Sequence, residues 1–385
     1  MLLRSTNKYD PAVSAPYLKT EPRPARKHKS KVTKYRAGKS KPWKAIKGPG
    51  RVTKFPGGFK HSWPVGLTNP NGAYCYRRAL LQCLIHLPAV YNYLGSIPHQ
   101  SDCERRISAC VVCGLQTLVN KYWNEKGRIS FPREAVAILD KAIRIRGHGS
   151  AMFPDAETNN QGDPHDLFMF LHDQLERNEF KWSTHLDRLF SVYRSYAWEC
   201  EDCGGPNQGN DPVSVYIPIP LAGSQGSGHD LDDHIEKWFY GEENRTCNVP
   251  NCNGTTVGTP KEREIDYWIT QSPEVLCINL QRQAYNHVTG VTSKIHDEVP
   301  YPEVLDLSEY TEDESELRYR LYGVVAHRGK GADEGHYIAS VRKHKAGFAT
   351  ISDESLINYA TTSRLLKPGH SKQNFDTALL FYLKI

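Results

Sequence analysis

A cysteine and a histidine far apart in the chain have surroundings in which they could perform nucleophilic catalysis. Cys75 lies in GLTNPNGAYCYRRALLQCL, where an Asn- and Gly-rich loop runs directly into an apolar segment with helical spacing. About 260 residues downstream, His336 lies in GVVAHRGKGADEGHYIASV, a pattern of strand, Gly-rich turn and strand, and Asp353 follows shortly afterwards. A thiol at the start of a helix with a distant His and a carboxylate is typical of a cysteine hydrolase.

The thiol must become a thiolate before it can attack a carbonyl carbon. The positive end of a helix and a neighbouring imidazolium both lower a thiol pKa, so the predicted helix and His336 could both activate Cys75. Arg77 and Arg78 enter the first helical turn, where acids are usually preferred, but they add positive potential beside the thiol. Taken singly, Cys75 and His336 would each be interpreted as buried structural residues. Their joint pattern favours catalysis.

The residues that position this pair divide into a helical half and a strand half. Apolar spacing predicts a helix from Tyr74 to Leu87, beginning near Cys75, and the other helix-patterned segments are Ser108–Tyr122, Arg133–Ile145 and Pro164–Glu176. After about Trp198 the short alternating runs predict strands, namely VSVYIPIPL, DYWITQ, EVLCINLQR, YRLYGVVAH, HYIASVR and ALLFYLKI. This order predicts a mixed α+β fold whose two halves meet at a cleft. GSQGSG (Gly223–Gly228) is interpreted as a flexible linker.

Composition bounds the class of protein. The chain has 385 residues, of which 39% are hydrophobic and 24% charged, as in ordinary globular proteins. No apolar run approaches the roughly 18 residues that a membrane-spanning helix needs, and the N-terminus lacks the apolar region of a secretory signal. Ten cysteines are too few for a disulfide scaffold, so we expect reduced thiols and a location in the nucleus or cytoplasm.

The charge is unevenly distributed along the chain. Residues 1–60 contain 17 Lys and Arg against two acids, a net charge of +15, so the remainder carries −9 of the total of +6. The basic segment has no apolar periodicity, and we expect a disordered tail that binds nucleic acid or an import receptor, or that is only solvated. The two ends must have different partners, because long-range charge chiefly sets the sign of a partner and its association rate.

Several collinear motifs resemble the ubiquitin-specific proteases, the papain-like family of deubiquitinating cysteine peptidases. The family's opening box, GLxNxGxTCYxNSxLQxL, is matched around Cys75, and its closing box, YxLxxVxxHxG…GHY, is matched around His336. Between and beyond them, QGDPHDLFMFLHDQL, PEVLCINLQR, YPEVLDLSEY and ALLFYLKI match further blocks in the family's order. The likeness covers roughly residues 64–385.

The resemblance implies a papain-like α+β fold with a helical thumb (64–197), zinc-ribbon-like fingers (198–270) and a β-rich palm (271–385). It implies a thiol-dependent deubiquitinase that hydrolyses the isopeptide bond at the C-terminal glycine of ubiquitin, with ubiquitin and ubiquitinated proteins as partners and a monomer as the working form. Cys75 would be the nucleophile and His336 the general base. The glycine-containing loop Arg328–Gly335 would gate the channel for the ubiquitin tail.

The sequence departs from the family pattern at several places, among them Arg78–Ala79 in place of the family's Asn–Ser pair. One extra residue separates Asn69 from Cys75, so the family's oxyanion-hole Asn corresponds to Asn69, which we prefer, or to Asn71 if the register shifts. The residue before the nucleophile is Tyr74 rather than Thr. The orienting Asp/Asn position is occupied by Ser352, with Asp353 next to it, so either residue could orient His336. Our expectation is that Ser352 orients the ring and that Asp353 supports it from close by.

The resemblance also points to a structural zinc site. Cys200-x2-Cys203 and Cys247-x4-Cys252 are similar to the cysteines of the family's zinc ribbon, and four thiolates in two pairs suit tetrahedral Zn²⁺. Cys110 and Cys113 form another x2 pair, but they lie in the apolar segment SACVVCGLQTLV. For these two we expect packing in the core rather than zinc binding.

Two alternatives to an active isopeptidase stay open. The longer Asn69–Cys75 loop and the missing orienting carboxylate would fit a catalytically impaired pseudoenzyme that binds ubiquitin without cleaving it. The basic tail could instead be the working part and could tether the protein to nucleic acid or ribosomes.

Overall fold

The structure, a computed structural model, describes most of the chain beyond the basic tail. The described residues are 64–97, 99, 103, 109–124, 131–156, 161–177, 183–221, 229–250, 252, 261–331, 334–343, 347–360 and 375–385. The predicted tail (1–60) and the Gly223–Gly228 linker fall outside them. Within these ranges no helix combines the length and apolarity needed to cross a bilayer.

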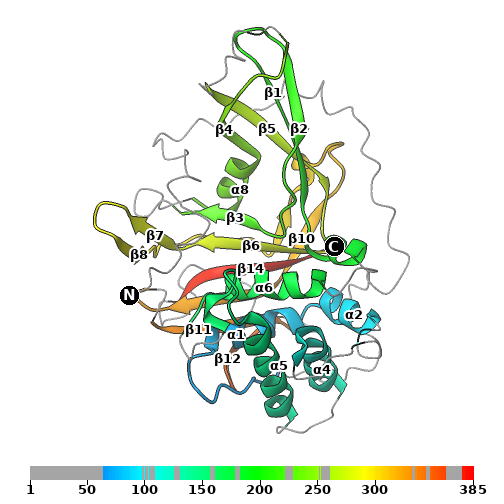
Figure 1. The fold of residues 1–385 in the computed structure, drawn as a ribbon, viewed down its shortest axis with the longest axis vertical. Helices are drawn as coiled ribbons and strands as arrows, with labels where there is room; N and C mark the ends of the chain where they lie inside the picture. Colours follow the sequence, from blue (N-terminus) through cyan, green and yellow to red (C-terminus); the bar gives the residue numbers. More distant parts are fainter. Residues whose placement is uncertain are drawn as a thin grey trace.

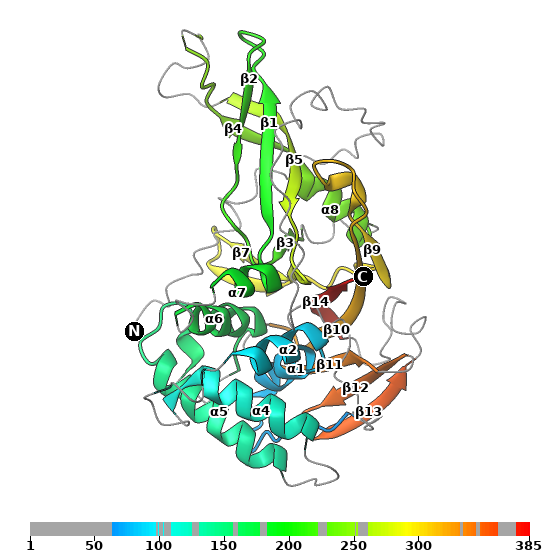
Figure 2. The same cartoon turned by 90° about the vertical axis from the view of Figure 1, so that its right-hand side faces the viewer.

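Helices gather at one end of the molecule, the lower end in Figures 1 and 2. They are α1 (Cys75–Ile85), α2 (Pro88–Ser96), α4 (Val111–Asn124), α5 (Phe131–Gly147), the 3₁₀ turn η4 (Pro154–Ala156), α6 (Pro164–Arg177) and α7 (Ser183–Phe190). The four helices predicted from apolar spacing all form, with ends within a few residues of those predicted. Every residue of α1 is buried, so this helix runs through the core rather than over the surface.

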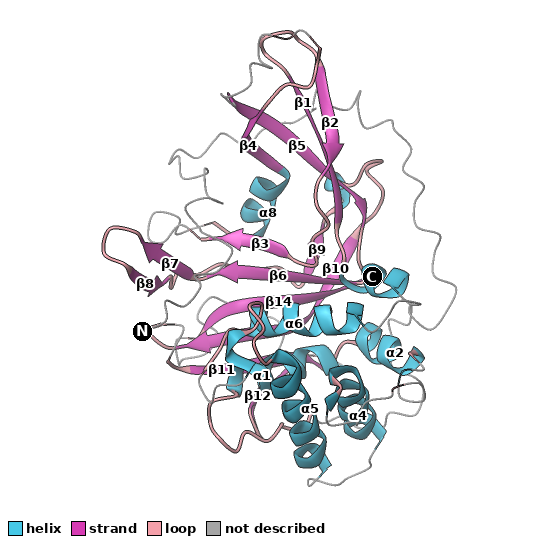
Figure 3. Ribbon diagram, in the orientation of Figure 1, coloured by secondary structure: helices cyan, strands magenta, loops and turns pink. Residues whose placement is uncertain are grey.

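An eight-stranded sheet crosses the middle of the molecule (Figure 3). Its strand order is β13-β12-β11-β10-β14-β6-β3, and β9 pairs with β10. All neighbours are antiparallel except the parallel pair of β3 and β6. The bounds are β3 Ile217–Pro220, β6 Val275–Gln281, β9 Val304–Asp306, β10 Arg318–Arg328, β11 His336–Arg342, β12 Phe348–Ser352, β13 Ser355–Ala360 and β14 Asp376–Lys384.

A second, four-stranded sheet projects from the other end, at the top of Figure 1. Its order is β2-β1-β5-β4, all antiparallel, with bounds β1 Tyr193–Glu199, β2 Pro206–Asn210, β4 Tyr240–Arg245 and β5 Lys261–Gln271. The hairpin of β7 (Gln283–Asn286) and β8 (Val291–Lys294) stands beside the large sheet. A further 3₁₀ turn, η6, spans Ser308–Tyr310.

One helix, α8 (Leu231–Phe239), lies in the half of the chain for which only strands were predicted. Its start is defined by a capping box in which the Asp230 side chain accepts the Asp233 N–H and the Asp233 side chain accepts the Asp230 N–H. Leu231, Ile235 and Phe239 recur every four residues and are its buried face. This periodicity was the sequence signal for a helix, and it was missed between two strand-like runs.

Two hydrophobic clusters form the main core, and the large sheet contributes to both. The first joins the helices to the sheet, with Cys75, Leu80, Val325 and Ala339 among its members. The second contains residues of α8 and of the projecting sheet, together with those of β6, β10 and β14. In consequence α1 is held against β10, β11 and β12 by apolar packing. The α+β class predicted from the sequence is confirmed.

Candidate active site and cysteine-rich fingers

Cys75 is the first residue of α1, as predicted, and it is fully buried. Burial raises the pKa of its thiol, and the backbone N–H of Tyr337, which hydrogen-bonds the sulfur, opposes that increase. The negative charge of Asp353 raises the pKa further, while the backbone amides of Tyr76 and of Cys75 itself lower it. The net shift is upward, so the thiol is mainly protonated at neutral pH until something else removes its proton.

His336 is the first residue of β11, and β11 packs against α1, the helix that begins with Cys75. The next residue, Tyr337, supplies the amide that reaches the Cys75 sulfur, which brings the two ends of the predicted pair together on packed elements. The Nε2 atom of His336 lies 2.7 Å from the Ser352 Oγ, at the end of the adjacent strand β12. The imidazole edge that carries Nε2 is thus held by Ser352.

The preceding residue, Gly335, has a backbone conformation that favours glycine. Its φ is 132°, and a Cβ there would lie 2.1 Å from the Arg328 carbonyl oxygen and 2.6 Å from Nε2 of His327. Its carbonyl oxygen accepts a 2.7 Å hydrogen bond from the Gln161 side chain, just before α6. The start of β11 is therefore fixed from two sides. The sequence placed Gln161 in a matching family block but gave it no role.

Asn69 and Asp353 meet beside this pair. The Asn69 Nδ2 donates to the Asp353 Oδ1 at 3.1 Å, and the Asn69 Oδ1 accepts the Tyr74 N–H at 3.1 Å, one residue before the helix. Burial raises the pKa of the Asp353 carboxyl. The hydrogen bond from Asn69 and the positive charges of His336 and Arg78 oppose that shift. Asp353 contacts the predicted oxyanion residue, whereas Ser352 contacts the His336 ring.

Close backbone contacts explain why Asn69 reaches Asp353. The Leu67 N–H donates to the Asp353 carbonyl at 2.7 Å, and a Cβ on Gly66 would lie 2.2 Å from the Glu354 carbonyl carbon. Asp353 itself has a φ of 48°, in the turn between β12 and β13. Asp and Asn adopt this left-handed region more readily than most residues. The missing side chain of Gly66 lets this loop approach the backbone of Glu354, and the positive φ of Asp353 allows the tight turn between β12 and β13.

The extra residue of the Asn69–Cys75 loop is accommodated in a turn. The Gly72 N–H donates to the Asn69 carbonyl at 3.2 Å, Gly72 has a φ of 67°, and Asn71 is exposed. Asn69, rather than Asn71, therefore faces Asp353.

Arg77 and Arg78 are both buried, and their hydrogen bonds join α1 to α5, to η4 and to the segment before Asn69. Arg78 binds both carboxylate oxygens of Asp140 on α5, at 2.9 and 2.5 Å, and donates to the Thr68 carbonyl at 2.6 Å. Arg77 donates to the carbonyl oxygens of Asp155 and Ala156 in η4. An electrostatic role beside Cys75 was predicted for these arginines. The structure shows them joining α1 to the helices and, through Thr68, to the residue next to Asn69.

The four finger cysteines lie together at the end of the projecting sheet. Their ligand atoms are all within 4.8 Å of one another, and the Cys200–Cys252 and Cys203–Cys247 sulfur pairs are 3.7 and 3.9 Å apart. Sulfurs on a tetrahedral zinc ion lie about 3.8 Å apart, whereas disulfide sulfurs are about 2 Å apart. All four thiols are free. The residues fit a structural zinc ion.

Backbone amides surround these sulfurs as they commonly do in metal-binding turns. The Gly205 N–H donates to the Cys203 sulfur and the Val249 N–H to the Cys247 sulfur, each at 3.4 Å. Burial raises the pKa of Cys247, but hydrogen bonds from Asn207 and Val249 outweigh it and lower the pKa to about 7. The second cysteine pair has the wider x4 spacing, yet its sulfurs still lie beside those of the first pair.

Comparison with known proteins gives a consistent picture. A protein-family model described as Ubiquitin carboxyl-terminal hydrolase matches residues 65–382. The chain is 27% identical over 332 residues to human Ubiquitin carboxyl-terminal hydrolase 17-like protein 6, covering 83% of this chain and 74% of that protein. It has the same identity to the human 17-like protein 22 over 83% of this chain, but covers only 56% of that relative. The chain thus spans little more than half the length of several curated relatives.

Solved structures share the fold. A chain of the SAGA DUB module of Ubp8, Sgf11, Sus1 and Sgf73 bound to monoubiquitin matches with a TM-score of 0.69 at 20% identity, covering 87% of this chain and 72% of that one. The same module bound to ubiquitin aldehyde matches with a TM-score of 0.68 at 20% identity, covering 86% and 72%. The expected architecture of thumb, palm and fingers is thereby confirmed as a fold, while the exact domain boundaries stay predictions.

Proposed function

The chain belongs to the ubiquitin carboxyl-terminal hydrolase family, in its ubiquitin-specific protease type, and from this premise we propose that it is an active thiol isopeptidase. Its substrate would be the isopeptide bond that joins the C-terminal glycine of ubiquitin to a protein amine. The observation that carries the proposal is the convergence of Cys75, the His336–Ser352 pair and the Asn69–Asp353 pair at one end of α1.

In the first step the Cys75 sulfur attacks the glycine carbonyl carbon, and His336 takes the thiol proton. Since the Nε2 of His336 is bound to Ser352, Nδ1 is the ring atom assigned to this transfer. The sulfur–carbon bond forms, the carbonyl becomes an oxyanion, and collapse expels the amine, which receives the proton from His336. Water, deprotonated by the same ring, then hydrolyses the thioester and regenerates the thiol.

Charge on the oxyanion would be stabilised by two N–H donors. One is the backbone amide of Cys75 at the N-terminus of α1, and the other is the side-chain amide of Asn69. An amide group has two N–H bonds, so Asn69 can donate one to Asp353 and keep the other for the oxyanion. Asp353 would act as a positioning residue for Asn69.

Ser352 would serve as the orienting residue of a Cys75–His336–Ser352 triad. Its hydroxyl can accept the Nε2 proton of His336 and so fix the tautomer that presents Nδ1 to the thiol. A hydroxyl carries no charge, so it stabilises the imidazolium less than a carboxylate would. Asp353 partly compensates, because its charge acts on His336 without direct contact.

The second candidate function is a ubiquitin-binding pseudoenzyme. One observation favours it: Cys75 is fully buried and its pKa is raised, so the thiol is not preformed as a thiolate. In an active enzyme, binding of the ubiquitin tail would have to bring the sulfur into contact with the carbonyl carbon.

A ubiquitin derivative with an electrophilic C-terminus distinguishes the two functions. The active enzyme becomes covalently labelled and hydrolyses a fluorogenic ubiquitin conjugate, and Cys75→Ala abolishes both signals. The buried thiol Cys277 supplies a matched control, since Cys277→Ala should retain labelling. Measurable ubiquitin binding without labelling of the wild-type protein would support the pseudoenzyme and overturn the isopeptidase.

In the fingers, Cys200, Cys203, Cys247 and Cys252 would hold zinc, whose role there is to cross-link the turns of the projecting sheet. The ion would thereby hold the tip of the fingers, which is well away from the Cys75 thiol, in one conformation.

The −9 charge of residues 61–385 would favour the basic contact face of ubiquitin. We further propose a monomer in the nucleus or cytoplasm whose basic tail binds nucleic acid or an import receptor.

A further inference from the structure

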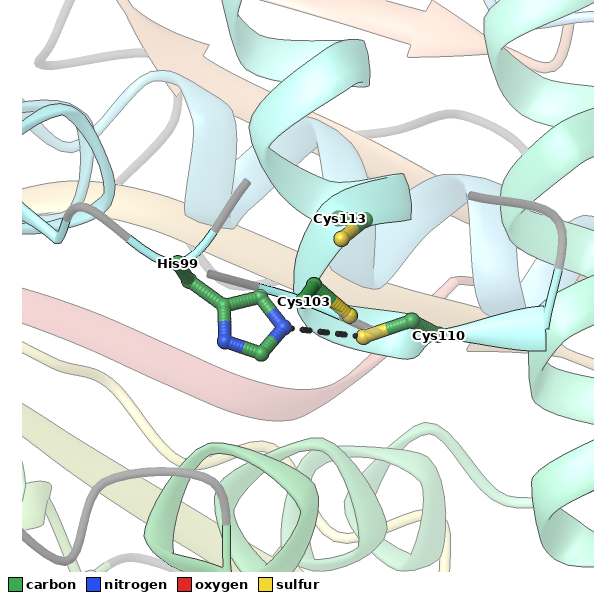
Figure 4. A group of neighbouring side chains, drawn as sticks. All are labelled: His99, Cys103, Cys110 and Cys113. Carbon is green, nitrogen blue, oxygen red and sulfur yellow. Dashed lines mark hydrogen bonds between the residues drawn. The ribbon is translucent and has the colours of Figure 1, made fainter. Parts of the chain in front are cut away.

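Four potential metal ligands converge in the helical half, far along the chain from the finger cysteines. They are His99, Cys103, Cys110 and Cys113, and their ligand atoms all lie within 4.8 Å of one another (Figure 4). The His99 Nε2 is 3.0 Å from the Cys110 sulfur. The Cys113 sulfur is in hydrogen-bonding contact with the sulfurs of both Cys103 and Cys110.

These distances suit a tetrahedral ion. With zinc–sulfur and zinc–nitrogen bonds of about 2.3 and 2.0 Å, neighbouring ligand atoms would lie about 3.5 to 3.8 Å apart. The 4.8 Å limit of the group accommodates that range. The 3.0 Å contact between His99 and Cys110 is about 0.5 Å shorter than it, so these two ligands would separate slightly around an ion. Three thiolates and one imidazole are a common ligand set for structural zinc, and soft sulfur ligands select zinc over magnesium or calcium.

The interpretation of Cys110 and Cys113 as core residues agrees with their burial but does not account for the side chains that their sulfurs contact. Each is 1% exposed, as core packing requires. Their sulfurs nevertheless turn toward His99 and Cys103, which are only partly buried, rather than toward apolar side chains alone. A disulfide would use two of the sulfurs, but all are free. Packing alone does not explain why an imidazole joins three thiols.

Two of the four ligands lie where a helix begins. Cys110 immediately precedes α4, and Cys113 lies in its first turn. The spacing His-x3-Cys-x6-Cys-x2-Cys brings two ligands from the helix start and two from the preceding segment. This division between two chain segments is typical of structural sites, in which the ion cross-links them.

We propose that His99, Cys103, Cys110 and Cys113 form a second structural zinc site, separate from that of the fingers. The bound ion would fasten the segment that contains His99 and Cys103 to the start of α4. The same helix already holds the end of α2, because the Gln116 side chain donates to the Leu94 and Ile97 carbonyls, each at 2.8 Å. Zinc would thus complete the junction between α2 and α4, next to the helix that carries the nucleophile.

Metal content of the full chain, purified under reducing conditions and measured by mass spectrometry, tests the proposal. We expect two zinc ions per wild-type chain and one in the double variant Cys110→Ser/Cys113→Ser. The finger variant Cys200→Ser/Cys203→Ser should also retain one, and the combination of both pairs should retain none. Cys277→Ala, a buried thiol outside both groups, should keep two. A Cys110→Ser/Cys113→Ser chain with the same zinc content as wild type would overturn the site.

A second measurement on the unmutated chain covers the case in which the double variant does not fold. Alkylation is followed at each cysteine with and without a strong chelator. A site that holds zinc predicts that Cys103, Cys110 and Cys113 are protected together and become reactive together when the chelator is added. Equal alkylation of these three with and without chelator, or a Cys110–Cys113 disulfide in freshly purified protein, would contradict it.

Cobalt substitution then identifies the ligands. In the Cys200→Ser/Cys203→Ser background, Co²⁺ should give the visible absorption of a tetrahedral site with three sulfurs and one nitrogen. His99→Cys should preserve binding and shift the spectrum toward that of four sulfurs, while His99→Ala should weaken binding. An unshifted spectrum in His99→Cys would remove His99 from the ligand set and overturn the proposed site.

Discussion

The Asn69 amide donates a 3.1 Å hydrogen bond to the Asp353 carboxylate, although 284 positions separate the two residues in the chain. The bond links the loop before the nucleophile to the turn after the strand that carries Ser352. A displacement of either segment would therefore change both the oxyanion donor and the partner of His336.

Substitution of Asn69 should affect turnover more than binding. Loss of one oxyanion donor lowers kcat by about 100-fold or more, so we expect this fall in Asn69→Ala with little change in KM. Asn71, the residue of the alternative register, is exposed, and Asn71→Ala should retain wild-type kcat. Steady-state hydrolysis of a fluorogenic ubiquitin conjugate measures both. A larger loss in the Asn71 variant would reverse the assignment.

Removal of the Ser352 hydroxyl should slow catalysis because the His336 ring loses its hydrogen-bond partner. A hydrogen bond to a charged group contributes about 1.5–3 kcal/mol, so Ser352→Ala should lower kcat by about 10-fold to 100-fold. Ser352→Asp should restore much of it, because a carboxylate both orients the ring and stabilises its positive charge. Wild-type turnover in Ser352→Ala would exclude Ser352 from the triad.

The reactivity of Cys75 should depend on pH in a direction that Asp353 controls. Since burial raises the thiol pKa and the Asp353 charge raises it further, the thiolate fraction should rise only on the alkaline side of the ordinary cysteine range. Asp353→Asn removes the negative charge, so the pKa should fall and the alkylation midpoint should move to lower pH. Asn also tolerates the positive φ at this turn.

Peptide mass spectrometry of Cys75 alkylation against pH gives this midpoint. The neighbouring substitution Glu354→Gln removes a carboxylate of the same turn and should leave the Cys75 midpoint in place. A midpoint that moves to higher pH in Asp353→Asn would show that the electrostatic interpretation has the wrong sign.

Gly66→Ala should destabilise the protein and reduce activity together. The added Cβ would lie 2.2 Å from the Glu354 backbone, so the loop and the turn must separate, at a cost of about 1–3 kcal/mol. Gly95 in α2 has nothing within 4 Å of an added Cβ, and Gly95→Ala should leave activity unchanged and stability equal or higher. Denaturant unfolding with parallel activity assays compares the two. Equal stability of both variants would show that the contact between Gly66 and the Glu354 backbone leaves room for a Cβ atom.

Loss of the Arg78–Asp140 pair should be expensive because Arg78 is buried. Asp140→Ala leaves its guanidinium without the carboxylate and should lower the free energy of unfolding by about 3 kcal/mol. Glu134 on the same helix pairs with Lys121 at 3.6 Å on the surface, and Glu134→Ala should change stability by about 0.5 kcal/mol or less. Similar effects of the two substitutions in denaturant unfolding would contradict this difference.

Local patterns in the sequence predicted much of the fold. The apolar spacing after Cys75 predicted α1, and the alternating runs predicted β6, β10, β11 and β14. The strands β1, β12 and β13 were missed because Arg, Ser, Thr or Asn residues interrupt the alternation of apolar residues in them. The helix α8 was missed because strand-like runs flank it, although its capping box lay in the sequence.

The site was predicted less completely, for a physical reason. A thiol at a helix start leaves a local signature, and the family motifs supplied His336, Ser352 and Asp353. Contacts such as Asn69–Asp353 and Arg78–Asp140 depend on which segments pack together, and no local spacing encodes that. Likewise, Cys110 and Cys113 have core-like neighbours in the sequence, and only the fold brings His99 and Cys103 to them.

The turn from Asn69 to Gly72 faces solvent, so a change in the length of this loop need not move the helix that follows it. Because Asn69 is fixed on one side and Tyr74 on the other, residues inserted between them would project outward without moving the nucleophile. This position should therefore accept a fluorescent reporter, placed a few residues from the reacting sulfur, with which arrival of the ubiquitin tail could be followed in real time.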